Sequence, residues 1–222
     1  LPGLGYLRED LYRTAARAGL QEAKTRWVNN FSLEEEERKL IAKRAEEPEL
    51  VILIEKGISP EKVPHPNWQA IPKFVPRSNP VDHVALTIEG VDGVFKSQEL
   101  FNVEAVAIEN LDEKFGGLLA KRIGGVVVKE GVGYVVREKV NPLLGDLLRL
   151  GMHVIDRADL RSWLTLPQSF HVIRVHVPGG QPLKLSLQAQ DAGDGAHGSV
   201  IEKIVEIPKR KRSKVFVPLR VI

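Results

Sequence analysis

Apolar side chains recur at helical spacing in the first part of the chain. Residues 7–18, LREDLYRTAARA, place Leu7, Leu11 and Ala15 four positions apart. This spacing predicts an amphipathic helix that ends at Gly19. A second short helix, QEAKTRWVNNF, is expected to follow almost without a linker. Two short helices in a tight hairpin are typical of the end of a helical-repeat region.

The next segment contains signals for a third helix and then a buried strand. Ser32 and Glu35 have the spacing of a capping box, which predicts a helix over LEEEERKLIAKRAEE that ends before Pro48. The apolar run ELVILIEKG is better explained as a buried strand than as a helix. Six prolines between residues 59 and 80 are expected to prevent regular strand pairing there.

The middle of the chain predicts strands followed by a long helix. VDHVALTIEGVDGV has the pattern of a strand, a turn and a second strand, and FNVEAVAI is a further strand candidate. From residue 109 to 139 the apolar positions have helical spacing, which predicts a core-facing helix. The glycine pairs at 116–117 and 124–125 would let another backbone approach closely, or a break would lie near Gly124 or Gly131. A short helix is expected to begin at Pro142.

The last part of the chain alternates with a period of two. Residues 170–189 predict a β-hairpin around a PGG turn, with His171 and His176 on opposite faces of the first strand. SVIEKIVEI and SKVFVPLRVI predict a second strand pair, which the basic run 209–214 separates.

These elements together predict an α+β fold. The short N-terminal helices form the end of a repeat region over residues 1–47. An α+β module follows over residues 48–222, with mixed strands around the long apolar helix and an antiparallel unit of β-hairpins over 170–222.

Composition narrows the classes of protein that fit. Of the 222 residues, 43% are hydrophobic and 27% are charged, which is typical of a folded globular chain. There is no cysteine, so disulfides and thiolate chemistry are excluded. No apolar run is long enough to span a bilayer. The chain begins at Leu1 rather than methionine, and we therefore expect further residues upstream.

Motifs of known catalytic chemistry are missing from the sequence. It contains no HExxH, EF-hand, Walker or nucleophile-elbow spacing, so we expect no catalytic residues, no metal and no cofactor. His153 with Asp156 and Asp159 is the nearest thing to a reactive cluster. The net charge is only +3, and the basic excess lies in the run 209–214, which has no interleaved aromatic residue. The run either contacts nucleic acid or another anionic surface, or forms a charged hairpin tip that keeps a strand edge from pairing. We favour the hairpin tip and expect no nucleic-acid partner.

The stretch RADLRSWLTLPQSF, residues 157–170, holds the candidate binding residues Asp159, Arg161 and Trp163. These side chains either face a ligand or form a structural corner, in which Arg161 caps carbonyl groups and Trp163 fills the core. The structural role is favoured, and the binding role remains open.

Four segments, taken in order, resemble a family of uncharacterised bacterial envelope lipoproteins. They are YLREDLYRTAARAG, ELVILIEKGISPEK, VEAVAIENLDEKFGGLLAKRI and ADLRSWLTLPQSFHVIRVHVPGG. The resemblance implies a tetratricopeptide-like region and a lipid anchor upstream of this chain, and a location on the periplasmic side of the outer membrane. It also implies envelope proteins as partners and carries no catalytic residues.

Three functions follow as hypotheses. The first is a non-enzymatic scaffold or docking module of the cell envelope, linked to cell-wall assembly. The alternative is a module that binds a cell-wall glycan or lipid through the long apolar helix and Trp163. The third is a hydrolase that uses His153, Asp156 or Asp159, which requires these side chains to converge.

Overall fold

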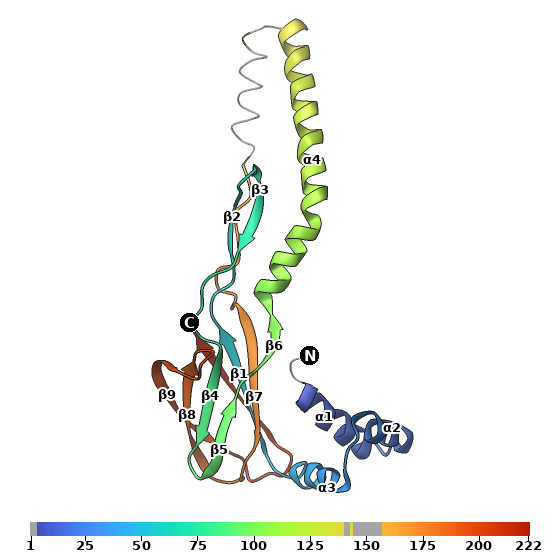
Figure 1. The fold of residues 1–222 in the computed structure, drawn as a ribbon, viewed down its shortest axis with the longest axis vertical. Helices are drawn as coiled ribbons and strands as arrows, with labels where there is room; N and C mark the ends of the chain where they lie inside the picture. The colour runs from blue at the N-terminus through green and yellow to red at the C-terminus, as the bar shows by residue number, and fades with distance from the viewer. Residues whose placement is uncertain (1–3, 140–142, 144–156) are drawn as a thin grey trace. The chain divides into compact units, whose positions relative to one another are not determined.

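The fold is mixed α+β, as predicted, and divides into two compact units (Figure 1). The computed structural model describes residues 4–139, 143 and 157–222. We call the first unit the sandwich unit; it comprises Leu1–Gly57, Asn79–Asn102 and Ser169–Ile222. The second, the helix unit, comprises Ile58–Ser78 and Val103–Gln168. The units therefore differ from the predicted segments 1–47 and 48–222, because the N-terminal helices belong with the strands.

The sandwich unit is built from two four-stranded sheets. The first has the order β10-β1-β7-β6 and the second the order β5-β4-β8-β9. β10 pairs with β1 in parallel, and all the other pairs are antiparallel. The strands of the first sheet are β10 (Lys214–Val221), β1 (Glu49–Lys56), β7 (Ser169–His176) and β6 (Gln98–Asn102). Those of the second are β5 (Val91–Lys96), β4 (His83–Ile88), β8 (Pro182–Gln190) and β9 (Ala196–Glu206).

Alternating apolar residues of both sheets meet in one core. Ile52 of β1 and Leu86 of β4 are fully buried, and Ile173 of β7 is 1% exposed. Because successive side chains of a strand point to opposite faces, every second residue of these strands enters the core. The predicted strands ELVILIEK and HVALTI are thereby confirmed.

One continuous stretch supplies an edge strand to each sheet. β5 pairs with β4 in the second sheet, and β6 pairs with β7 in the first. Ser97 lies between them, where its amide donates to the Val84 carbonyl and its hydroxyl accepts from the Val84 amide. Because the stretch changes sheets here, β6 reaches only residues Ser169 to Val172 of β7.

Three short helices complete the sandwich unit. They are α1 (Leu4–Arg17), α2 (Gln21–Phe31) and α3 (Glu35–Arg44), and Tyr12, Leu33 and Ile41 form their small core. The predicted capping box is wrong. Ser32 ends α2 in the left-handed conformation, with φ of 49°, and Glu34 precedes α3 without a side-chain cap.

The helix unit contains a hairpin and a long helix. The hairpin strands are β2 (Glu61–His65) and β3 (Trp68–Val75), and the helix is α4 (Val103–Lys139). The prediction that prolines prevent pairing over residues 59–80 is wrong, since Pro64 lies opposite Pro72 in this ladder. A two-stranded sheet leaves one edge of each strand free, so a proline can direct its missing donor outward.

The long helix is present, but its described side chains do not face a core. Its described side chains are half-buried or exposed, and Val106 and Tyr134 are 39% and 61% exposed. A Cβ atom built on Gly116 or Gly124 would meet nothing within 4 Å, so the predicted close approach of another backbone is not found there. The helix starts at Val103, earlier than predicted. The strand expected over FNVEAVAI is therefore wrong for residues 103–108, and β6 (Gln98–Asn102) includes only its first two residues.

The C-terminal strands were predicted in the right places but with the wrong partners. β7 and β8 do not form a hairpin, because β7 pairs with β1 and β6 while β8 pairs with β4 and β9. β9 and β10 likewise lie in different sheets. The run 209–214 is therefore a connection between sheets and not a hairpin tip.

Candidate functional site

The outer face of the first sheet carries charged residues where the inner face carries apolar ones. In β7, Ile173 and Val175 enter the core, while Arg174 and His176 face helix α1. The period of two that buries one set of side chains places the other set on the opposite face. This confirms that His171 and His176 lie on opposite faces, since His171 contacts Ser97 and Ser169 on the inner side.

Arg174 is the centre of a network of ions. Its Nη1 and Nη2 donate to the two oxygens of Asp10 at 2.7 and 2.9 Å, and its Nε donates to Oε1 of Glu49 at 2.6 Å. The guanidinium also lies over the ring of Tyr6, 5.0 Å from its centroid. Burial lowers the pKa of Arg174, but the hydrogen bonds to the two carboxylates outweigh burial and raise it.

Glu49 is the most buried member of the network, with 3% of its surface exposed. Lys214 approaches its Oε2 to 3.2 Å and Arg13 approaches it to 3.8 Å. Burial raises the pKa of Glu49, but the hydrogen bond and charge of Arg174 outweigh it and lower the pKa overall. The network thus fixes α1 and the sheet to each other with buried, compensated charges.

His176 and Glu9 form a second contact between β7 and α1. Nε2 of His176 lies 3.3 Å from Oε1 of Glu9, and this hydrogen bond lowers the pKa of Glu9. Nδ1 of His176 is buried and has no hydrogen-bond partner among the described residues.

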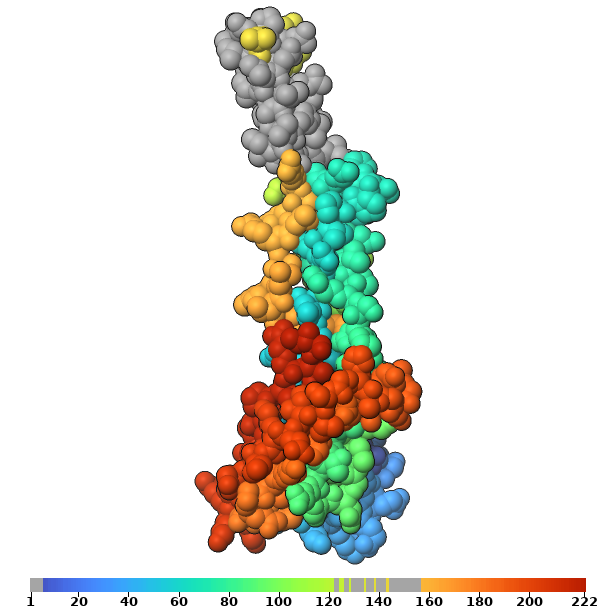
Figure 2. All heavy atoms as spheres, turned by 90° about the vertical axis from the view of Figure 1, so that its left-hand side faces the viewer, coloured from blue at the N-terminus to red at the C-terminus, as the bar shows by residue number. Residues whose placement is uncertain are grey.

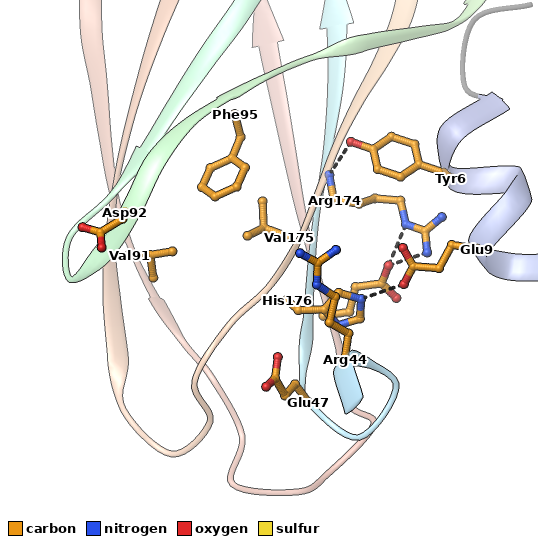
Figure 3. Close-up of a pocket in the computed structure, with 11 residues that line it drawn as sticks. Tyr6, Glu9, Arg44, Glu47, Val91, Asp92, Phe95, Arg174, Val175 and His176 are labelled. Carbon is orange, nitrogen blue, oxygen red and sulfur yellow. Dashed lines mark hydrogen bonds and ion pairs between the residues drawn. The ribbon is translucent and has the colours of Figure 1, made fainter. Parts of the chain in front are cut away.

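A cleft of about 340 Å³ opens beside these residues. Figure 3 shows Tyr6 and Glu9 projecting from α1, with Val91 and Phe95 of β5 on the other side of β7. We call this feature the β7 cleft. One wall is apolar and the other is charged, with four carboxylates and two guanidinium groups among the lining side chains. The lining residues are Tyr6, Glu9, Arg44, Glu47, Glu49, Val91, Asp92, Phe95, Arg174, Val175 and His176.

The floor of the β7 cleft is an unpaired strand edge. The amide of Val177 donates to the carbonyl of Pro48, so odd-numbered residues of β7 direct their backbone groups toward β1. Arg174 and His176 then direct theirs away from β1. The pairing of β6 ends at Val172, and in the described part of the chain no strand pairs with residues 174–176 on this side of β7. The Arg174 amide donates to the Tyr6 hydroxyl at 3.3 Å.

The predicted binding residues lie in the helix unit. Both guanidinium and amide groups of Arg161 donate to Asp159, which lowers the pKa of that carboxyl. Trp163 is 72% exposed, so the prediction that it fills the core is wrong. Its carbonyl accepts from the hydroxyl of Ser59 at 3.1 Å, and this segment lies beside the β2–β3 hairpin (Figure 2). Asp159 and Arg161 therefore pair with each other, and neither they nor Trp163 line the β7 cleft.

The remaining sequence predictions concern the cluster around His153, the basic run 209–214, metal ions and membrane spans. His153 and Asp156 lie outside the described residues, so their convergence with Asp159 is not tested. Within the basic run, Arg212 bonds to Glu46, and Lys214 approaches Glu49. The described residues include no group of three or more His, Cys, Asp or Glu side chains able to hold a metal ion. In the same part of the chain, no helix is both long and apolar enough to cross a membrane.

Sequence reasoning missed the network around Arg174. The alternation in β7 placed Arg174 and His176 on one face, and that was the available signal. The partner Asp10 is 164 positions away, and nothing local indicates that α1 covers this face. Comparisons with protein-family models, curated proteins and solved structures found no significant match to this chain.

Proposed function

We propose that this protein is a non-enzymatic docking module that binds a segment of a partner protein in the β7 cleft. The observation that supports the proposal is the cleft itself, which combines an apolar wall, a charged wall and an unpaired strand edge. Such a combination suits a peptide, because a peptide supplies apolar side chains, charged side chains and backbone hydrogen bonds together.

The rigidity of the surroundings also supports docking. The network of Asp10, Glu49 and Arg174 fixes α1 against β7, and Ile173 and Val175 fix β7 in the core. A binding surface held by packed neighbours loses little conformational entropy when it binds, so more of the interaction energy appears as affinity.

The proposal is tested with a displayed library of random linear octapeptides, panned against the full chain. We expect enriched peptides that lose at least about tenfold in affinity for the variant Glu47→Lys/Asp92→Lys, which reverses two charges of the cleft. The matched control is Glu113→Lys, an exposed charge reversal on α4. No enrichment, or equal loss in the control, contradicts the proposal.

The location in the bacterial cell envelope is a separate proposal, based on the sequence resemblance. Fractionation of the native host with an antibody to this chain tests it. Recovery with the outer membrane supports an envelope docking module that assists cell-wall assembly. Recovery in the cytosol contradicts the location but leaves the β7 cleft as a docking site.

A further inference from the structure

We infer that the β7 cleft binds its partner by strand addition, and that the bound segment alternates apolar and basic residues. The inference rests on the proposed function and specifies how the partner is recognised. An extended peptide would lie beside residues 174–176 and continue the first sheet beyond the end of β6.

Backbone groups on the cleft floor supply the main contacts. Arg174 and His176 direct their N–H and C=O groups toward the cleft, and only the Arg174 amide is taken, by the Tyr6 hydroxyl, in the described structure. The Arg174 carbonyl, the His176 amide and the His176 carbonyl match the alternate donor and acceptor groups of an extended strand. A strand in this position would satisfy all three.

The walls of the β7 cleft define two classes of side chain in the added strand. Residues that point inward meet Val91, Phe95 and Val175, which belong to or border the apolar core. Residues that point outward meet Glu9 and Glu47 on the side of α1 and α3. Because side chains alternate along a strand, the bound segment needs apolar residues at every second position.

Charge identifies the outward positions as basic. The lining has four carboxylates and two guanidinium groups, and Arg174 and Glu49 pair with each other. This pairing leaves Glu9, Glu47 and Asp92 against Arg44. Glu47 and Asp92 form no side-chain ion pair or hydrogen bond with any described residue. Lysine or arginine in the peptide would complement these carboxylates, whereas an acidic peptide would be repelled.

Two synthetic peptides of alternating Val–Lys and Val–Glu test the side-chain pattern against the full chain. We expect Val–Lys to bind at least about tenfold more tightly at low salt, with the difference reduced at high salt. Equal binding of the two peptides, or tighter binding of Val–Glu, would overturn the basic assignment.

Backbone methylation tests strand addition. Two forms of the Val–Lys peptide carry N-methyl groups on alternate amides. One form is methylated on the valine amides and the other on the lysine amides. Because only one set of amides faces β7, we expect one form to lose at least about tenfold in affinity and the other to lose little. Equal affinities of the two forms overturn strand addition.

A pair of protein variants gives an independent test. His176→Pro removes the edge amide, while His176→Ala keeps it and removes only the side chain. The proline variant should bind at least about tenfold more weakly than the alanine variant. Circular dichroism checks that both fold, and the peptide methylation test remains decisive if the proline variant does not.

The two proposals fail in different ways. One outcome is that library peptides bind with an affinity that depends on Glu47 and Asp92, while the two N-methylated peptides bind equally well. In that case the docking proposal stands and strand addition is overturned. If no library peptide binds, the proposed function is overturned together with this inference.

Discussion

The sandwich unit and the helix unit differ in how much apolar surface they bury. Ile52, Leu86 and Leu185 of the sandwich unit are fully buried, whereas the buried apolar side chains of the helix unit are, among the described residues, only those of Ile71 and of two prolines, Pro60 and Pro167. Apolar burial is the main favourable term in folding. We therefore expect the sandwich unit to hold most of the free energy of unfolding, and its cleft to be the more rigid surface.

The largest effect is expected from a substitution in the core of the sandwich unit. Ile173→Ala should lower the free energy of unfolding by about 4 kcal/mol, because it leaves a cavity where a side chain is 1% exposed. Urea unfolding followed by circular dichroism measures the change. The matched substitution in the helix unit is Leu160→Ala, at a side chain that is 42% exposed. Equal losses in the two variants would contradict the comparison.

The next largest effect is expected from a substitution that removes Arg174, the central cation on the outer face of the first sheet. Arg174→Met should cost about 3 kcal/mol, because it leaves the buried carboxylate of Glu49 without its main partner. Adding Glu49→Gln should recover part of that loss, which gives a coupling free energy of at least about 1 kcal/mol in a double-mutant cycle. Additive effects would show that the network does not act as a unit.

A smaller effect comes from His171, which is buried between Ser97 and Ser169. Burial, and then the charge of Lys56, lowers its pKa from 6.5 to about 4. The unfolded chain thus binds a proton at higher pH than the folded chain. Stability is complete above pH 6.5 and falls as the pH drops toward 4, by on the order of 2 kcal/mol.

Urea unfolding at several pH values checks this dependence against the variant His171→Asn. Carboxylates also titrate as the pH falls. The informative quantity is therefore the difference in the free energy of unfolding between the parent and the variant. We expect the variant to lose less stability than the parent between pH 6.5 and 4. Identical pH profiles would assign the loss to other groups.

The smallest effect is expected from a substitution of an exposed side chain in the helix unit. Trp163→Ala should change the free energy of unfolding by no more than about 0.5 kcal/mol, because the side chain is 72% exposed. Urea unfolding measures it. A loss above about 2 kcal/mol would mean that Trp163 fills a core, which is the role that sequence reasoning favoured.

The positions of β1, β4 and the C-terminal strands could be predicted from the sequence, whereas the β2–β3 hairpin and the partners of the C-terminal strands could not. The continuous apolar run of β1 and the alternation of β7 indicate which residues are buried. They do not indicate which strand lies alongside. The hairpin predicted over 170–189 failed for this reason, since the PGG turn connects two sheets instead of two paired strands.

The candidate site was less accessible to sequence reasoning than the fold. Asp159, Arg161 and Trp163 attracted attention because charged and aromatic residues are adjacent in the chain. The β7 cleft instead depends on Asp10 and Arg174, which meet only after folding, and on the change of sheets at Ser97. Neither contact leaves a local pattern.

The most direct test of the account is amide hydrogen exchange at His176, measured by NMR with and without the alternating Val–Lys peptide. Strand addition predicts that this amide, which faces the open edge of β7, exchanges at least about tenfold more slowly when the peptide is bound. The amide of Val175, which faces β1, should change little. Saturated peptide binding with no slowing at His176 would contradict the claim that the β7 cleft receives a strand.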